Sequence, residues 1–306
     1  MILKCGLFKS LFQSVSAFCN AGFDLIGSES MIPFATSRII NITCMTLTIM
    51  GGLGFLVWDD ISNCIKEGFK NKISFTRILK KFTLHTKLVL ILQIVLMLIG
   101  TFAFLVCEYD NPNTIANFNL NDKILISAFH SVSARTAGFA TVNLSMSKDI
   151  TKMFLIILMI IGAAPGSMAG GIKTTTLFVL ILGVVTSIRG KKNINIFKRT
   201  ISNGTFLKAV SVVVIAVVVL VTANMFLAIN SNIYILDLFF ESASAFATVG
   251  LTSSALAKMN MLCQSAIILL MYIGRIGTVT MAVAFVMKKP KENDLVVYAK
   301  EDVIVG

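Results

Sequence analysis

Long apolar runs alternate along the chain with short polar and basic segments. A helix needs roughly 20 apolar residues to cross the hydrocarbon of a membrane. Five runs approach or exceed that length, at about 36–58, 85–107, 150–188, 206–229 and 261–287. Five such runs are too many for one buried core. The pattern therefore predicts an all-α polytopic membrane protein.

The run at 150–188 is too long for one simple crossing of the bilayer. Small and helix-breaking residues interrupt it, namely Gly162, Pro165, Gly166, Gly170 and Gly171. Backbone that is not helical survives at membrane depth only where it lines protein or water. We therefore expect a broken or re-entrant segment inside the protein.

Basic residues cluster between the apolar runs and predict which side of the membrane each loop faces. The first cluster consists of Lys66, Lys70, Lys72, Arg77, Lys80, Lys81 and Lys87. The second consists of Arg189, Lys191, Lys192, Lys198, Arg199 and Lys208, and the third of Lys288, Lys289 and Lys291. Because loops rich in Lys and Arg stay in the cytoplasm, we expect all three segments there and the acidic loop at 108–122 outside.

The composition narrows the classes of protein that fit. The chain is 56% hydrophobic and 14% charged, with a mean hydropathy of +0.85, so it has too few polar residues to cover a water-soluble globule. The net charge of +12 does not indicate nucleic acid, because the basic residues lie in loops rather than on one soluble face. The six scattered cysteines and two distant histidines predict no metal site, catalytic set or cofactor.

Three segments outside the five runs, at 7–24, 122–141 and 235–253, repeat one motif. Each reads Phe-x-Ser-x-Ser-Ala and, a few residues later, Gly before a bulky apolar residue. The copies contain Phe12, Ser14, Ser16, Ala17 and Gly22, then Phe129, Ser131, Ser133, Ala134 and Gly138, then Phe240, Ser242, Ser244, Ala245 and Gly250. The glycines lie 116 and then 112 residues apart, which predicts a repeated structural module.

Each copy is too short to cross the bilayer and predicts a helix that enters from the outer side and stops half-way. A glycine just past such a helix permits a positive φ, and the carbonyls that it turns toward an axis can replace the hydration shell of a small cation. For a single copy, an interfacial helix with a capping glycine is the better interpretation. Three copies favour a re-entrant pore segment.

The chain resembles the Trk/Ktr/HKT superfamily of potassium transporters, and most closely its KtrB-type membrane subunits. The resemblance lies in residues 14–24, 131–141, 170–176, 242–252 and 274–277. In that family four span–pore–span modules surround a pore, and each contributes one glycine to a potassium filter. The resemblance implies that the ion-binding filter contains Asn20, Ala21, Gly22, Thr136, Ala137, Gly138, Thr248, Val249 and Gly250.

The resemblance also implies that the chain starts at Met1 inside the second module. We therefore expect the first module and the first span of the second to be missing, as in a truncated or split reading frame or a fragment. In plant relatives the filter position of the first module helps to separate sodium from potassium. The selectivity of this chain stays open for that reason.

The expected layout follows the modules. Residues 1–60 hold the pore helix, filter and second span of repeat two, and 61–84 form a basic cytoplasmic loop. Residues 85–188 form repeat three with its broken inner helix, and 189–205 form a second basic loop. Repeat four covers 206–288, and 289–306 form a cytoplasmic tail.

The glycine-rich break at 166–174 looks at first like a phosphate-binding P-loop. It fails because Ile172 separates Gly171 from Lys173 and no strand precedes it. The family resemblance instead implies an intramembrane gating loop with Gly170, Gly171 and Lys173. The alternative is a kinked helix whose Lys173 side chain snorkels to the cytoplasmic interface.

Arg275 lies in the middle of the last apolar run and is expected to face the protein interior or water, because a charge at the centre of a span is costly. It resembles the pore-side arginine of the family's last module. One hypothesis is that Arg275 acts in gating, by pairing with the loop or by setting an electrostatic barrier. A structural ion pair between helices is the equal alternative.

The function that we expect is potassium uptake across the plasma membrane through a carbonyl-lined filter gated by the intramembrane loop. The alternatives are a non-conducting fragment or remnant and a sodium-permeable relative. Beyond the transported K⁺ we expect no metal or cofactor, with Na⁺ open as a coupling or activating ion. A membrane-embedded enzyme would need a convergent catalytic set, which the sequence does not offer.

The resemblance also implies partners and an orientation. We expect a homodimer with a cytosolic nucleotide-binding ring of the KtrA or TrkA type on the basic inner face. Anionic lipid headgroups suit the same basic loops equally well. The filters would face the outside, and the C-terminus the cytoplasm.

Overall fold

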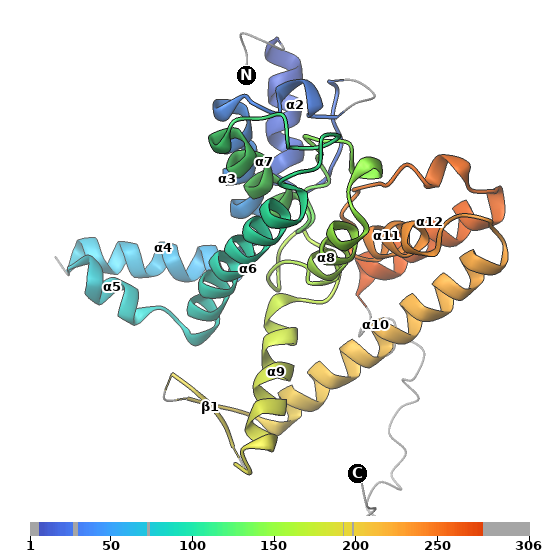
Figure 1. Cartoon of the computed structure of the whole chain (residues 1–306). Coiled ribbons are helices and arrows are strands. Elements are labelled where there is room, and N and C mark those ends of the chain that lie inside the picture. The colour runs from blue at the N-terminus through green and yellow to red at the C-terminus, as the bar shows by residue number, and fades with distance from the viewer. Residues whose placement is uncertain (1–5, 27–29, 72–73, 192, 198, 278–306) are drawn as a thin grey trace, which may run out of the picture.

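Figure 1 shows the computed structural model of the chain, which describes residues 6–26, 30–71, 74–191, 193–197 and 199–277. These residues are mostly helical, so the predicted fold class is confirmed. The α-helices are α2 (Leu7–Phe18), α3 (Arg38–Gly52), α4 (Phe55–Lys70), α5 (Phe75–Lys81), α6 (Leu84–Glu108), α7 (Leu120–Ser133), α8 (Asp149–Ile160), α9 (Thr174–Ile188), α10 (Asn203–Ile229), α11 (Ile235–Phe246) and α12 (Met261–Ile276). Single 3₁₀ turns lie at Ile32–Phe34, Leu144–Met146 and Leu256–Lys258.

The helices α6 and α10, with 25 and 27 residues, are long and apolar enough to cross a membrane. The shorter apolar helices α9 and α12 have 15 and 16 described residues. The predicted run at 150–188 is split into α8 and α9 by the non-helical segment 161–173. The end of the run at 261–287 and the tail at 289–306 lie outside the described residues.

The predicted span at 36–58 is bent rather than formed by one straight helix. Helix α3 ends at Gly52, and α4 leaves it at an angle of 94°. At the bend Gly54 has a φ of 82°, and a β-carbon at this position would lie 2.5 Å from the carbonyl oxygen of Pro165, which belongs to a segment distant in sequence. A side chain at position 54 would be strained by this φ and would collide with the Pro165 carbonyl, which explains why a glycine occupies the bend.

The basic segment at 61–84, which the sequence predicts as a loop, is mostly helical. Helix α4 continues to Lys70 and α5 follows, and the two form an arm on the left of Figure 1. Cys64 of α4 packs with Ile78 and Phe82, which gives the arm a small apolar core. The second basic segment, at 189–205, contains the hairpin of β1 (Ile194–Ile196) and β2 (Arg199–Ile201).

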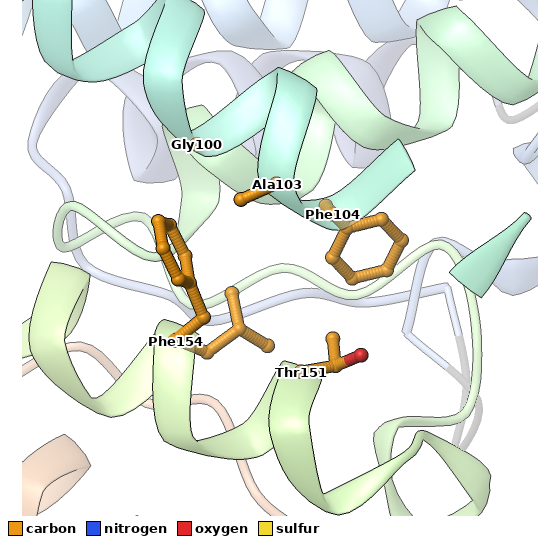
Figure 2. Close-up of a pocket in the computed structure, with 6 residues that line it drawn as sticks. Gly100, Ala103, Phe104, Thr151 and Phe154 are labelled. Carbon is orange, nitrogen blue, oxygen red and sulfur yellow. The ribbon is translucent and has the colours of Figure 1, made fainter. Parts of the chain in front are cut away.

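Three groups follow one another, each built on a short helix of the repeated motif: α2 with the helix α3 after it, and α7 and α11 each with apolar helices before and after. The pore helix α2 packs on α3, α7 packs on α6, and α11 packs on α10 and α12. The groups touch through α3 with α7 and through α8 with α11. Tight packing joins the two spans of the middle group: Figure 2 shows Gly100, Ala103 and Phe104 facing Thr151 and Phe154 across a gap too small for a water molecule.

Candidate ion-conduction site

The three motif glycines lie side by side, each directly after the end of its pore helix. Gly22, Gly138 and Gly250 have φ values of 75°, 78° and 94°, a region that side chains rarely adopt. A β-carbon added to Gly22 would lie 3.6 Å from the Cα of Gly138, and so would one added to Gly250. Segments that are more than 100 residues apart in sequence therefore meet at one point.

Backbone carbonyls line this meeting point. A β-carbon at Gly22 would lie 3.1 Å from the Ala137 oxygen and 3.5 Å from the Val249 oxygen. At Gly138 it would overlap the Val249 oxygen. The predicted filter residues Ala137 and Val249 thus turn their carbonyls toward the glycine of the neighbouring module.

The residues two positions before each glycine share a second property. Asn20, Thr136 and Thr248 also have positive φ values, of 51°, 87° and 53°. Their side-chain oxygens are buried and accept no hydrogen bond from the described residues. Buried polar atoms are normally paired, so three free oxygens at equivalent positions suit a ligand that brings its own positive charge.

The second serine of each motif ties the pore helix to the turn that follows it. Ser16 donates to the carbonyl of Phe23 at 2.6 Å, and Ser133 donates to the carbonyl of Phe139 at 2.5 Å. Ser244 instead accepts the N–H of Gly250 at 3.1 Å. The spacing of serine and glycine in the motif follows from these bonds.

The first serine ties the pore helix to an outer span in two of the modules. Ser131 donates to the carbonyl of Met97 in α6 at 2.8 Å, and Ser242 accepts from Asn224 of α10 at 2.7 Å. Ser14 bonds within its own helix, to Ser10. Sequence reasoning missed Asn224, although a lone polar residue inside an apolar run is a usable signal.

The middle copy differs from the other two. It has one residue fewer between its second serine and its glycine, and Arg135 lies in the shortened stretch. The buried Arg135 guanidinium reaches α6, where it donates to the side-chain oxygen of Gln93 at 2.6 Å and to the Gln93 carbonyl at 3.3 Å. Gln93 was not predicted, and it is another polar residue inside an apolar run.

The segment 161–173 lies against the glycine turns. A β-carbon at Gly170 would overlap the Thr248 hydroxyl and lie 2.9 Å from the Ala247 carbonyl, and one at Gly171 would lie 3.2 Å from the Ala247 β-carbon. The segment is also bonded to the bend between α3 and α4. Ala164 donates to the Gly52 carbonyl at 3.2 Å, and Phe55 donates to the Gly166 carbonyl at 3.1 Å.

Both predicted cationic side chains contact this segment. Lys173 donates from Nζ to the Ala169 carbonyl at 2.5 Å. Arg275 donates to the Met168 carbonyl from the last helix, α12. Within the part of the chain that the structure describes, Arg275 makes no ion pair.

A cavity of about 900 Å³ lies on the remaining side of the glycine turns. Ala21, Gly22 and Phe23 line one wall, and residues of α11 and α12, including Glu241 and Gln264, line the other. The cavity therefore lies between the first and last described modules, which approach each other at Gly22 and Val249.

The fold and the site define a class of protein: a helical membrane protein built from repeated segments whose glycine turns meet at one point. The family model of the TrkH cation transport proteins matches residues 4–295. The chain belongs to this family, whose members transport cations and are not enzymes.

The curated relatives include the Ktr system potassium uptake protein B of Vibrio alginolyticus, 38% identical over 99% of this chain and 64% of that protein. The protein of the same name from Bacillus subtilis is 36% identical over 92% of this chain and 60% of its own length. The potassium/sodium uptake protein NtpJ of Enterococcus hirae is 34% identical, with coverages of 98% and 64%. The chain thus spans under two thirds of these relatives.

A solved structure shares the fold. The crystal structure of the potassium transporter TrkH from Vibrio parahaemolyticus superposes with a TM-score of 0.72 at 18% identity. The superposition covers 90% of this chain and 58% of that one.

Proposed function

We propose that the protein takes up potassium ions through a filter formed at the three glycine turns. The observation that carries the proposal is the convergence of Gly22, Gly138 and Gly250, each at positive φ, with the carbonyls of Ala137 and Val249 close to the glycines of neighbouring modules. Such oxygens can replace the hydration shell of a dehydrated cation. The free side-chain oxygens of Asn20, Thr136 and Thr248 support a further coordinating layer at one end of the filter.

We further propose that the segment 161–173 gates this path. Its Gly170 lies against Thr248, so an ion leaving the filter on that side meets the segment. Arg275 and Lys173 hold the segment through its own carbonyls rather than through an acidic partner. Bonds of this kind can break without leaving a buried carboxylate unpaired, which suits a part that moves.

The cavity beside the turns supports a four-part pore. Three modules cover three sides, and the space between Phe23 and α12 is open. We propose that a further span–pore–span module fills it in the natural full-length protein. Sodium permeation is the second candidate function, because one relative is named a potassium/sodium uptake protein.

We propose the plasma membrane as the location, with the filter toward the outside and the arm of α4 and α5 toward the cytoplasm. The basic residues of the arm and of the hairpin support this orientation. A homodimer and a cytosolic nucleotide-binding ring remain the proposed partners, and the word "system" in the names of two relatives agrees with a second component. Anionic lipids are a third proposed partner of the basic face.

Growth rescue of a bacterium deficient in potassium uptake tests the proposal. The full-length protein should restore growth at low potassium and take up rubidium, and Gly138→Ser should abolish both. Gly190→Ser is the matched control, because Gly190 also has a positive φ, of 64°, but has no atom within 4 Å of a β-carbon. Membrane-inserted wild-type protein without uptake would contradict the proposed function.

A further inference from the structure

One position in each motif copy differs in chemistry, although its neighbours repeat. It is the residue between Phe and the first Ser, and it is Gln13, His130 and Glu241 in the three copies. All three side chains are buried, at 1%, 0% and 5% exposure, and among the described residues those of His130 and Glu241 have hydrogen-bond partners whereas that of Gln13 has none. Polar side chains buried at membrane depth are costly unless they are bonded, so their partners matter.

Glu241 bonds the chain just past its glycine turn. Its Oε1 accepts from the Thr252 hydroxyl at 2.6 Å, from the Ser253 N–H at 2.9 Å and from the Ser253 hydroxyl at 3.2 Å. The Thr252 hydroxyl oxygen in turn accepts the Ser254 N–H at 2.9 Å. One carboxylate oxygen therefore holds residues 252–254, which follow Gly250, directly or through the Thr252 hydroxyl.

His130 occupies the equivalent place in the middle module. Its Nε2 accepts the Thr141 N–H at 3.3 Å and lies 3.1 Å from the Thr141 hydroxyl. Thr141 follows Gly138 by three residues, as Ser253 follows Gly250. The Phe104 ring stacks on the imidazole with centroids 4.8 Å apart, which holds the ring in place.

In each of these two modules, two side chains of the pore helix bond the chain at or just past its glycine. The second serine bonds the nearer residue, Phe139 through Ser133 and Gly250 through Ser244. The residue before the first serine bonds the chain two or three positions past the glycine, and we call this the outer bond. The chain that leaves the glycine turn cannot shift without breaking one of these bonds.

We propose that Glu241 and His130 are positioning residues that set the carbonyl spacing of the filter and so its preference for potassium over sodium. The proposal rests on the proposed function of the turns as a filter. The physical reason is that a coordination site keeps its geometry only when supporting bonds hold its ligands. Loss of the outer bond lets the turn relax toward the smaller ion.

Rubidium uptake by the full-length protein under sodium competition tests the proposal. Glu241→Leu removes the acceptor and should lower the preference for rubidium over sodium about tenfold, the order expected for stranding buried donors of a charged acceptor. Glu241→Gln keeps Oε1 as an acceptor and should retain most of the preference. Glu67→Leu is the matched control, because Glu67 is exposed and pairs with Lys81 on the arm.

A second pair of variants checks the bond itself. Thr252→Val removes one of the donors to Glu241 and should lower the preference in the same direction. Combined with Glu241→Leu, it should add little, because both changes break the same bond. A fully additive double variant, or a Glu241→Leu protein with unchanged preference and normal uptake, would overturn the proposal.

Hydrogen exchange separates this proposal from the proposed function. If the wild-type protein shows no uptake, the proposed function fails, but the outer bond still predicts faster exchange at residues 251–254 in Glu241→Leu than in wild type or Glu67→Leu. Equal exchange in all three proteins would overturn the proposed positioning role of Glu241 as well.

Discussion

Strained residues and their supporting bonds alternate at each glycine turn. Asn20 and Thr248 adopt positive φ values of 51° and 53° without being glycines, and each such residue costs on the order of 1–3 kcal/mol. The serine bonds at Ser16 and Ser244 lie within a few residues of them. Because these serines bond the chain at or just past each glycine, they help to hold the strained residues in place.

Ser133→Ala tests this support at the scale of one residue. Ser133 is 1% exposed, and its loss leaves the Phe139 carbonyl without this hydrogen bond. The free energy of unfolding should therefore fall by about 1–3 kcal/mol. Thermal unfolding of the purified protein measures the change. The control is Ser211→Ala, because Ser211 is exposed and bonds its own helix at 3.0 Å; equal effects of the two variants would refute the role given to Ser133.

Sequence reasoning picked out the three glycines that meet in the structure but not the residues on other helices that support their turns. The repeated Phe-x-Ser-x-Ser-Ala spacing pointed to Gly22, Gly138 and Gly250 because a periodic signal survives without a structure. The bonds of Gln93 and Asn224 are long-range contacts between different helices. Their residues are visible as polar interruptions of apolar runs, but their partners depend on helix packing that no local pattern encodes.

At the scale of elements, one buried carboxylate fastens the two spans of the middle module. Glu108, at the end of α6, is fully buried. It accepts from Asn111 at 2.6 Å, from Thr114 at 2.7 Å, and from the backbone N–H of Lys148 at 2.9 Å, where α8 begins. The Thr151 hydroxyl also donates to it. The Glu108 carboxylate therefore links the end of α6 to the start of α8.

Glu108→Gln should destabilise the protein, because the amide turns one acceptor into a donor that faces other donors. Loss of a buried hydrogen-bond acceptor lowers the free energy of unfolding by about 1–3 kcal/mol, and by more when the acceptor is charged. Chemical denaturation in detergent measures this difference. For comparison, Glu67→Gln removes a pair with side chains 43% and 62% exposed and should cost under about 1 kcal/mol; a Glu108→Gln protein as stable as that control would rule out the clamp.

The segment 161–173 is the element on which the gating proposal depends. Arg275→Gln removes a donor to the Met168 carbonyl, so the segment should leave the filter more often and rubidium uptake should rise several-fold. Arg38→Gln is the control, since Arg38 is exposed at the start of α3. Identical uptake kinetics in wild type and Arg275→Gln would show that Arg275 has no role in gating.

The elements were predictable where composition changes sharply along the chain. Glycines and Pro165 in the run at 150–188 indicated the break that separates α8 from α9. The bend at Gly54 was missed because the apolar run continues through it to Trp58, and its cause is the approach of Pro165 from a distant segment. The helical arm was missed because basic charge was taken as the mark of a loop, although Val57 and Cys64 follow a helical spacing.

At the scale of the whole molecule, three modules surround the site on three sides and leave the cavity of about 900 Å³ on the fourth. We expect the 306 residues expressed alone to insert in the membrane without selective uptake. Co-expression with a segment that supplies the further module should restore uptake. Selective rubidium uptake by the 306 residues alone would show that uptake does not require a further module in the cavity.

Potassium flux through purified full-length protein in liposomes tests the filter most directly. Wild-type protein should release potassium or rubidium down a gradient faster than sodium, Gly190→Ser should behave like wild type, and Gly138→Ser should lose the flux or its selectivity. Equal fluxes of potassium in wild type and Gly138→Ser would contradict a conduction path through the three glycine turns.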